Sequence, residues 1–296
     1  MSLKIRLAIG SIVVGLVVLV IKGAAWWVTG SVALLSDALE STVNVATAVA
    51  ALVAIRVAAR PADASHPYGH DKAEYFSAVM EGVLILLAAI LILREAWSGF
   101  LAPRPPEAPA LGLAISLSAT ALNAGWAAVL IRRGRQERSP ALVADGRHLW
   151  TDVVTSAGVV LGIALALLTG IWVLDPVIAA LVALHILGSG WAIVRASLSG
   201  LMDEALPEER LADIRRLIAD SANGAHEAHD LRTRQAGTTT FIDFHLVVPG
   251  EMTVLESHEI CDRIEARIRR EFEDARIAIH VEPEHKAKQH GIVVLP

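Results

Sequence analysis

The chain has 296 residues, of which 54% are apolar and 19% are charged. In soluble proteins roughly a quarter of the residues are charged, so this composition indicates a membrane protein. The net charge of −5 argues against a nucleic-acid partner. The single cysteine, Cys261, excludes a disulfide framework within one chain, so any soft metal site must use histidine and carboxylate side chains.

Six apolar segments follow one another through the first two-thirds of the chain. Each is long enough to cross about 30 Å of hydrocarbon, which takes roughly 20 helical residues. We therefore predict a transmembrane bundle of six helices over residues 1–200, surrounded by lipid, with spans near 7–28, 32–56, 76–100, 110–131, 148–169 and 172–197. The Lys and Arg residues of the loops favour a cytoplasmic location for both termini, in a bacterial inner membrane.

The character of the chain changes after Leu206-Pro207. Residues 201–296 hold 19 of the 31 acidic residues and 7 of the 11 histidines. The apolar periodicity predicts the order helix, strand, strand, helix, strand over residues 208–220, 230–235, 240–248, 254–272 and 276–281. This order fits a cytoplasmic α+β domain of the ferredoxin-like kind over residues 201–285, followed by a loose tail over 286–296.

Two pairs of polar residues interrupt the apolar segments at helical spacing. Glu40 and Asn44 lie four apart in the second span, and His148 and Asp152 lie four apart in the fifth. Residues four apart share a helix face, so two such helices would enclose a four-ligand cation site. Imidazole, carboxylate and amide ligands suit zinc, iron or manganese. The alternative is that His148 and Asp152 hydrogen-bond to each other and Asn44 joins two helices.

Other polar residues fall inside predicted spans without a partner four residues away. They are Glu81, Asn123, Asp175 and His185. Ionisable groups in a membrane cost a few kcal/mol each and need a reason to be there. We expect hydrogen-bonding, interface or packing roles for these four.

The loop between the second and third spans carries another candidate metal site. Asp63, His66 and His70 supply one carboxylate and two imidazoles within eight residues, enough for a three-ligand site with an open position. The alternative is a polar turn stiffened by proline and glycine. Lys72 is a candidate partner for Asp203 in a salt bridge between the two domains, although a solvated lysine explains it equally well.

Histidines are distributed over every element of the C-terminal domain, which core packing does not explain. We predict a metal site from four of them and one acid that shares a strand face with the last: His229, His245, His258, His280 and Glu282. A pH-responsive surface is the alternative.

Four segments of the sequence resemble the cation diffusion facilitator family, most closely its bacterial zinc and ferrous-iron efflux pumps. They are the pair His148 and Asp152, the loop 65–74, the junction 201–207 and the strand 229–235. The resemblance covers essentially the whole chain. It implies a homodimeric exporter of divalent metal that is driven by counter-movement of protons. It also implies three metal sites on the residues named above: a transport site in the membrane, a site in the loop, and a binuclear cytoplasmic site that helps hold the dimer.

The chain departs from that family pattern at three ligands. Zinc-transporting members usually have aspartate at the positions of Glu40 and Asn44, and commonly at that of Glu282. With Asn44 neutral, the predicted transport site holds two carboxylates and one imidazole, which balance a dication. Since metal loading expels protons from ligands, we expect His148, and then Asp152 or Glu40, to carry the exchanged proton. The amide oxygen is a harder donor than imidazole, which favours manganese or ferrous iron modestly over zinc.

Several rival functions can be weighed from motifs. There is no GxxxxGK[ST] loop, so we expect an ion gradient rather than ATP to drive alternating access. The HExxH and GxSxG patterns are absent, so we do not expect an enzyme, nor an organic cofactor. Two alternatives stay open: a monovalent cation/proton antiporter on the same fold, and a membrane metal sensor. The four-residue site inside the membrane argues against the sensor.

Overall fold

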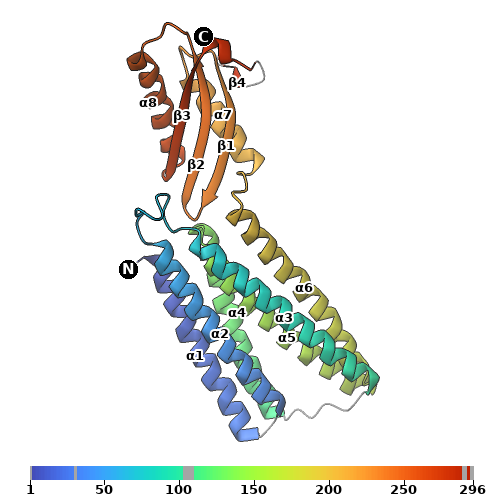
Figure 1. The fold of residues 1–296 in the computed structure, drawn as a ribbon. Helices are drawn as coiled ribbons and strands as arrows, with labels where there is room; N and C mark the ends of the chain where they lie inside the picture. Colours follow the sequence, from blue (N-terminus) through green and yellow to red (C-terminus); the bar gives the residue numbers. More distant parts are fainter. Residues whose placement is uncertain (1, 30–31, 103–109, 289–291, 294–296) are drawn as a thin grey trace. The chain divides into compact units, whose positions relative to one another are not determined.

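The computed structural model describes residues 2–29, 32–102, 110–288 and 292–293 (Figure 1). Within the helices some side chains lie outside this description, including that of Glu40. The chain divides into two units, Met1–Leu198 and Ser199–Pro296. We call them the helical unit and the C-terminal unit and describe each by itself.

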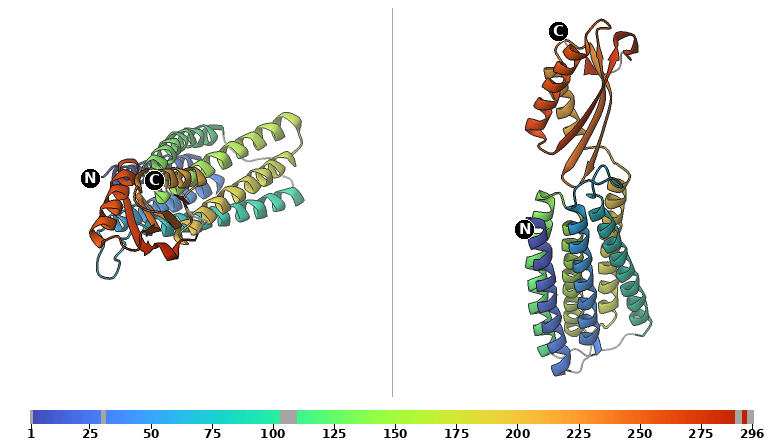
Figure 2. Two further views of the ribbon diagram at one scale, coloured as in Figure 1. Left: turned by 90° about the horizontal axis from the view of Figure 1, so that it is seen from above. Right: turned by 60° about the vertical axis from the view of Figure 1, so that its left-hand side comes forward.

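The helical unit consists of long helices wherever the sequence predicts a span. Among the described residues they are α1 (Leu3–Thr29), α2 (Val32–Ala58), α3 (Ala73–Leu101), α4 (Ala110–Gln136), α5 (Pro140–Thr169) and α6 (Leu174–Leu201). Figure 2 shows these helices running side by side. Three segments of described residues are long and apolar enough to cross a membrane: Leu3–Ala25, Ala73–Leu101 and Pro176–Leu201.

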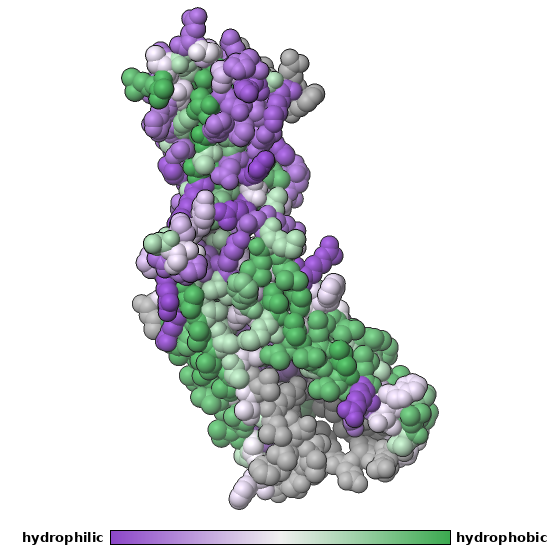
Figure 3. All heavy atoms as spheres, viewed as in Figure 1, coloured by the Kyte–Doolittle hydropathy of each residue, from purple (hydrophilic) through white to green (hydrophobic). Residues whose placement is uncertain are grey.

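Apolar side chains cover much of the outside of the helical unit. Large hydrophobic residues such as Val20, Leu91, Trp97 and Leu181 are more than half exposed, and the described surface in Figure 3 is mainly hydrophobic over these helices. Such extended apolar surface is unfavourable in water. It fits a helix bundle whose backbone polar groups are satisfied within each helix and whose outer face contacts lipid.

Inside the helical unit, small residues let the helices approach closely. α1 packs on α2 and α4, α4 on α5, and α5 on both α2 and α3. A Cβ atom added at Gly82 of α3 would lie 2.7 Å from Val194 of α6, and one added at Gly158 of α5 would lie 2.7 Å from Val182. Small residues at these contacts are the usual means of helix association in membranes. The contact between α2 and α5 brings the second and fifth predicted spans together.

The C-terminal unit is a sheet covered by helices. In chain order it has α7 (Glu208–Ser221), β1 (Glu227–Ala236), β2 (Thr239–Val248), α8 (Val254–Glu271), β3 (Ala275–Pro283), a short 3-10 turn (Glu284–Lys286) and β4 (Ile292–Val293). The strand order is β3-β2-β1-β4, antiparallel except for the parallel pair β2 and β3 that α8 connects. The predicted helix and strand order is thus confirmed, while the segment predicted as a loose tail contributes β4.

The core of the C-terminal unit lies on one face of the sheet. Alternate β2 residues, including Ile242, Phe244 and Leu246, pack with Ile218 of α7 and Ile264 of α8. Both helices lie on this face (Figure 2). Because side chains alternate along a strand, the odd-numbered residues of β2 point to the opposite face. That face carries His245.

Candidate metal-binding sites

The first candidate site lies between α2 and α5 in the helical unit. The side chain of Asn44 donates from Nδ2 to Oδ2 of Asp152 across the two helices. His148 lies one turn before Asp152 on α5, and all three side chains are buried, with 5–8% exposed. Glu40 lies one turn before Asn44 in α2, but its side chain lies outside the described residues. Three of the four predicted ligands are therefore buried at or beside one helix contact.

The amide of Asn44 leaves one ligand atom available. Its Oδ1 is buried and accepts no hydrogen bond from the residues that the structure describes. A hydrogen bond across helices is also what simple helix association would produce, so the contact with Asp152 alone does not mark a binding site. A buried acceptor without a donor is costly, however. A cation bound at Asn44 Oδ1 and Asp152 would satisfy both groups.

The loop between α2 and α3 forms the second candidate site. Asp63 lies between two imidazoles: His66 Nδ1 is 3.4 Å from one carboxylate oxygen, and His70 Nε2 is 3.4 Å from the other. The ring centroids of the histidines are 4.5 Å apart, and one ligand atom from each of the three residues lies within 4.8 Å of the others. The structure thus brings together all three predicted ligands.

Local hydrogen bonds hold the Asp63 carboxylate in its charged form. The Ser65 hydroxyl donates to it at 2.9 Å, and the backbone N–H groups of His66 and Ser65 donate at 2.7 and 2.9 Å. These bonds, that of the Ser65 side chain first, lower the pKa of Asp63 to about 2. A fixed carboxylate with two imidazoles can hold a divalent ion and leave a position for a further ligand.

The third candidate site is a row of imidazoles across three strands. His229 is the direct partner of His245 in the pairing of β1 with β2, and His245 is the partner of His280 in the pairing of β2 with β3. The ring centroids of neighbours are 5.3 and 4.9 Å apart. All three imidazoles belong to the face opposite the helices.

Glu282 lies at the centre of this row. Its Oε2 is 3.2 Å from His229 Nε2, and its Oε1 is 3.3 Å from His245 Nδ1 and 3.7 Å from His280 Nε2. Neutral imidazoles and a carboxylate are typical ligands of zinc and of other borderline divalent ions. The structure thus brings together four of the five predicted cytoplasmic ligands.

Two acids that the sequence did not single out also border this row. Asp230 forms a group with His229 and His245 whose ligand atoms lie within 4.8 Å of one another. It has a left-handed backbone, with φ of 55°, where the register of β1 shifts, and such a bulge re-aims side chains. The Lys288 ammonium bonds to Asp230 at 2.6 Å and lowers the pKa of its carboxyl. Glu227 lies 3.1 Å from His229 Nδ1.

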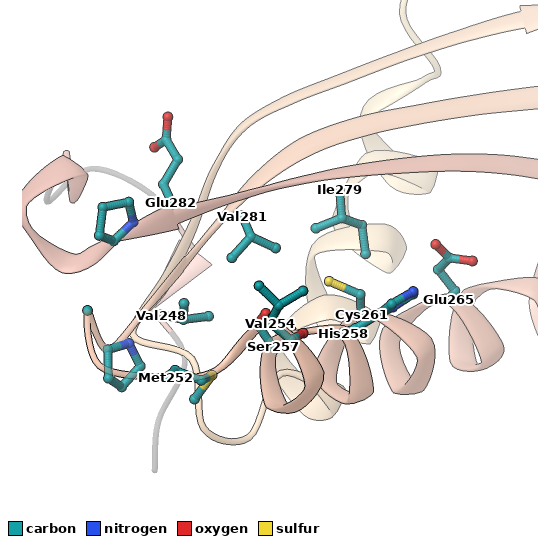
Figure 4. Close-up of a pocket in the computed structure, with 13 residues that line it drawn as sticks. Val248, Met252, Val254, Ser257, His258, Cys261, Glu265, Ile279, Val281 and Glu282 are labelled. Atoms are coloured by element: carbon teal, nitrogen blue, oxygen red, sulfur yellow. Dashed lines mark hydrogen bonds between the residues drawn. The ribbon is translucent and has the colours of Figure 1, made fainter.

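His258 is the predicted ligand that a single chain does not bring to the row. It lies on α8, largely exposed, with Nδ1 3.5 Å from Asp262 Oδ1. Figure 4 shows His258 on the helix with Cys261 and Glu265, whereas Glu282 points away from α8. The hollow in this view has a volume of about 500 Å³ and is lined by the helix and by Ile279 and Val281 of β3.

The predicted salt bridge involves residues of the two separate units. Lys72 lies in the helical unit and Asp203 in the C-terminal unit, so the pair stays a prediction. Within the C-terminal unit, Asp203 Oδ1 lies 3.4 Å from Arg234 Nη1.

Comparison with known proteins places both units in one family. Residues 8–202 match the family model of the cation efflux transmembrane domain, and residues 206–284 match that of the cation efflux protein cytoplasmic domain. The chain therefore belongs to the cation diffusion facilitator family, a family of cation-efflux transporters, as the sequence motifs predicted. It is a membrane protein with a helical transmembrane domain and an α+β C-terminal domain.

Two relatives span nearly the whole chain. An uncharacterized transporter of Synechocystis sp. is 45% identical over 285 residues, which are 96% of this chain and 92% of the relative. The cation-efflux pump FieF of Shewanella oneidensis is 34% identical over 273 residues, 92% of both chains. A solved structure of CzrB in a zinc form is 44% identical and covers 29% of this chain and 98% of its own, with a TM-score of 0.28.

Proposed function

We propose that this cation-efflux protein exports divalent metal ions, of the zinc, iron or manganese type, from the cytoplasm in exchange for protons. It would act as a homodimer in the bacterial inner membrane, with six spans and both termini in the cytoplasm. The observation that supports this most directly is the buried group Asn44, His148 and Asp152 at the contact of α2 and α5. Ionisable residues at such a place are costly and are usually functional.

In this proposal the Asn44–Asp152 hydrogen bond is the resting state of the site. A metal ion takes the Asp152 carboxylate, the Asn44 amide oxygen, the His148 imidazole and, as the fourth predicted ligand, Glu40. Because a metal replaces protons on its ligands, His148 and Asp152 release protons when the ion binds and regain them when it leaves. Rocking of helices then exposes the site to one side of the membrane at a time.

The other two sites would hold metal outside the membrane. Asp63, His66 and His70 would bind an ion at the loop, and His229, His245, His280 and Glu282 would bind ions on the open face of the C-terminal sheet. His258 belongs to the predicted cytoplasmic set but lies on the helix, so it would join from the second copy of the homodimer. The Lys72–Asp203 salt bridge would link the two domains.

Metal uptake by inside-out vesicles tests this function. We expect vesicles containing the protein to accumulate zinc, manganese or ferrous iron, and we expect His148→Ala to reduce uptake to the level of empty vesicles. His285→Ala, which changes an exposed histidine of the C-terminal unit, is the matched control and should transport normally. Uptake of sodium or potassium but of no divalent ion would favour the antiporter alternative.

A further inference from the structure

A second pair of acids is buried in the helical unit, apart from the proposed transport site. Glu81 of α3 is 0% exposed and Asp145 of α5 is 2% exposed. Ala78 and Ile85, one turn to either side of Glu81, belong to the same apolar cluster as Ala144. α3 packs on α5, and the two carboxyl groups interact electrostatically across this contact, so it encloses two buried acids.

Glu81 differs from another buried acid on the same face of α3. Glu74, seven residues earlier, is 2% exposed and is satisfied by Lys4 Nζ at 3.0 Å and by the Ser139 hydroxyl. Neither carboxylate oxygen of Glu81 accepts a hydrogen bond from any residue that the structure describes. Of the hydrogen-bonding, interface or packing roles predicted for Glu81, hydrogen bonding is therefore not observed within the described part of the chain, whereas its complete burial fits a position in the helix packing.

Asp145 has one hydrogen-bond donor and one neighbour that can carry charge. The Ser11 hydroxyl donates to its Oδ2 at 2.5 Å, and His148, one turn further along α5, interacts with it electrostatically. In the described part of the helical unit, neither Glu81 nor Asp145 forms an ion pair with a lysine or arginine within 4.0 Å. A buried carboxyl group without a counter-charge either takes up a proton or binds a cation, so two such groups at one helix contact can serve as cation ligands when they are deprotonated.

A cation held between the two acids would give both Glu81 oxygens the partner that the described residues do not supply. We propose that Glu81 and Asp145, together with the Ser11 hydroxyl, form a second divalent-cation site within the helical unit. Two carboxylates balance the charge of a dication, and carboxylate and hydroxyl oxygens are hard ligands of the kind that manganese and ferrous iron accept.

The position of this pair separates it from the proposed transport site. Asp145 precedes Asp152 by seven residues on α5, which is about 10 Å along a helix axis. It lies toward the end of the helical unit where α2 ends and α3 begins, the end that carries the loop with Asp63 and His70. If the site takes part in transport, an ion would occupy it after leaving the loop and before reaching Asp152. That role rests on the proposed export function, whereas cation binding itself does not.

Counting bound ions in the purified full-length protein tests the site. The parent protein carries Asp152→Ala, so that the proposed transport site is already removed. The number of manganese ions bound per chain is measured by equilibrium dialysis. We expect Glu81→Gln to lower the count by one ion per chain relative to this parent. Glu74→Gln is the matched control, since it removes a buried carboxylate of the same helix face, and we expect it to leave the count unchanged.

A double variant shows whether the two acids share one ion. We expect Asp145→Asn alone to lower the count by one, and the combination with Glu81→Gln to lower it by one as well, not by two. An unchanged count in folded Glu81→Gln protein would overturn the proposal, as would a loss of two ions in the double variant. Comparison of wild type with the Asp152→Ala parent tests the transport site separately, so the two ideas can fail independently.

Discussion

At the scale of single residues, the side chain of Asn44 explains most about the proposed transport site. Its amide nitrogen is used by Asp152, and its amide oxygen accepts no hydrogen bond from the described residues. The residue thereby fixes the orientation of Asp152 without adding a charge. The i, i+4 spacing of polar residues in the second and fifth spans predicted that these helices meet, because only one face of each carries ligands. It did not predict that Asn44 and Asp152 bond to each other.

Replacing the Asn44 amide by a carboxylate should change which ion the site prefers. Asn44→Asp adds a charge beside Asp152 and removes the neutral oxygen donor, so we expect the preference for zinc over manganese to rise. A tenfold change in the ratio of the affinities for zinc and manganese would correspond to a change of about 1.4 kcal/mol in the difference between their binding free energies. Competition between the two ions in vesicle uptake measures this, with Asn223→Asp in the C-terminal unit as control. An unchanged preference would refute the link between Asn44 and selectivity.

At the scale of elements, the strand pairings create the cytoplasmic site. His229, His245 and His280 are far apart in the sequence, but the register of β1, β2 and β3 places them in one row. Alternation along each strand could predict that these histidines share a face. The contribution of Asp230 could not be predicted, because it depends on a register shift and a left-handed residue that interrupt the alternation.

Removing the central acid should weaken metal binding by the C-terminal unit. Glu282 faces three imidazoles, so we expect Glu282→Gln to lower zinc affinity there by at least about tenfold, the usual scale for lost groups around a metal. Zinc titration followed through the histidine signals in an NMR spectrum reports this site selectively. Glu273→Gln changes an exposed acid of the same unit and should bind zinc normally. Equal affinities in the two variants would remove Glu282 from the ligand set.

The start of α8 depends on a capping box. The Thr253 hydroxyl accepts from the Glu256 N–H at 3.2 Å, and the Glu256 carboxylate accepts from the Thr253 N–H at 2.9 Å. We expect Thr253→Ala to destabilise this end of the helix by about 1 kcal/mol, seen as faster hydrogen exchange of the first α8 amides. Similar exchange rates in Thr253→Ala and wild-type protein would show that the cap contributes little.

The same cap should make the end of α8 sensitive to acid. Hydrogen bonds from the Thr253 side chain and backbone lower the pKa of Glu256. The stabilisation is therefore present above the ordinary glutamate pKa and is lost as the pH falls through the lowered value. We expect hydrogen exchange at the start of α8 to accelerate, relative to the rest of the helix, only below the ordinary pKa. Glu256→Gln should abolish that acid dependence, and its persistence in this variant would point to another group.

At the scale of the whole molecule, the amino-acid composition predicted the two units better than it predicted the individual membrane spans. The apolar first two-thirds of the sequence corresponds to the helical unit, and the acidic, histidine-rich last third corresponds to the C-terminal unit. Within the described residues, α1, α3 and α6 contain segments apolar enough to cross a membrane by themselves. The helices α2 and α5 carry Asn44, His148 and Asp152, and such ligands lower the apolarity of the helices that bear them. The strand β4 could not be predicted because a two-residue pairing leaves no periodic signal.

Metal-driven proton flux across sealed vesicles is the most direct test of the central claim, that side chains of α2 and α5 bind a metal ion in exchange for protons. With purified protein and a pH indicator, we predict that gradients of zinc, iron, manganese, cobalt or cadmium drive protons in the opposite direction for those ions that are transported. Asp152→Ala protein should move neither metal nor protons, while Asp213→Asn, a change at a partly exposed residue of α7, should behave as wild type. Proton flux of wild-type size in folded Asp152→Ala protein would contradict the claim.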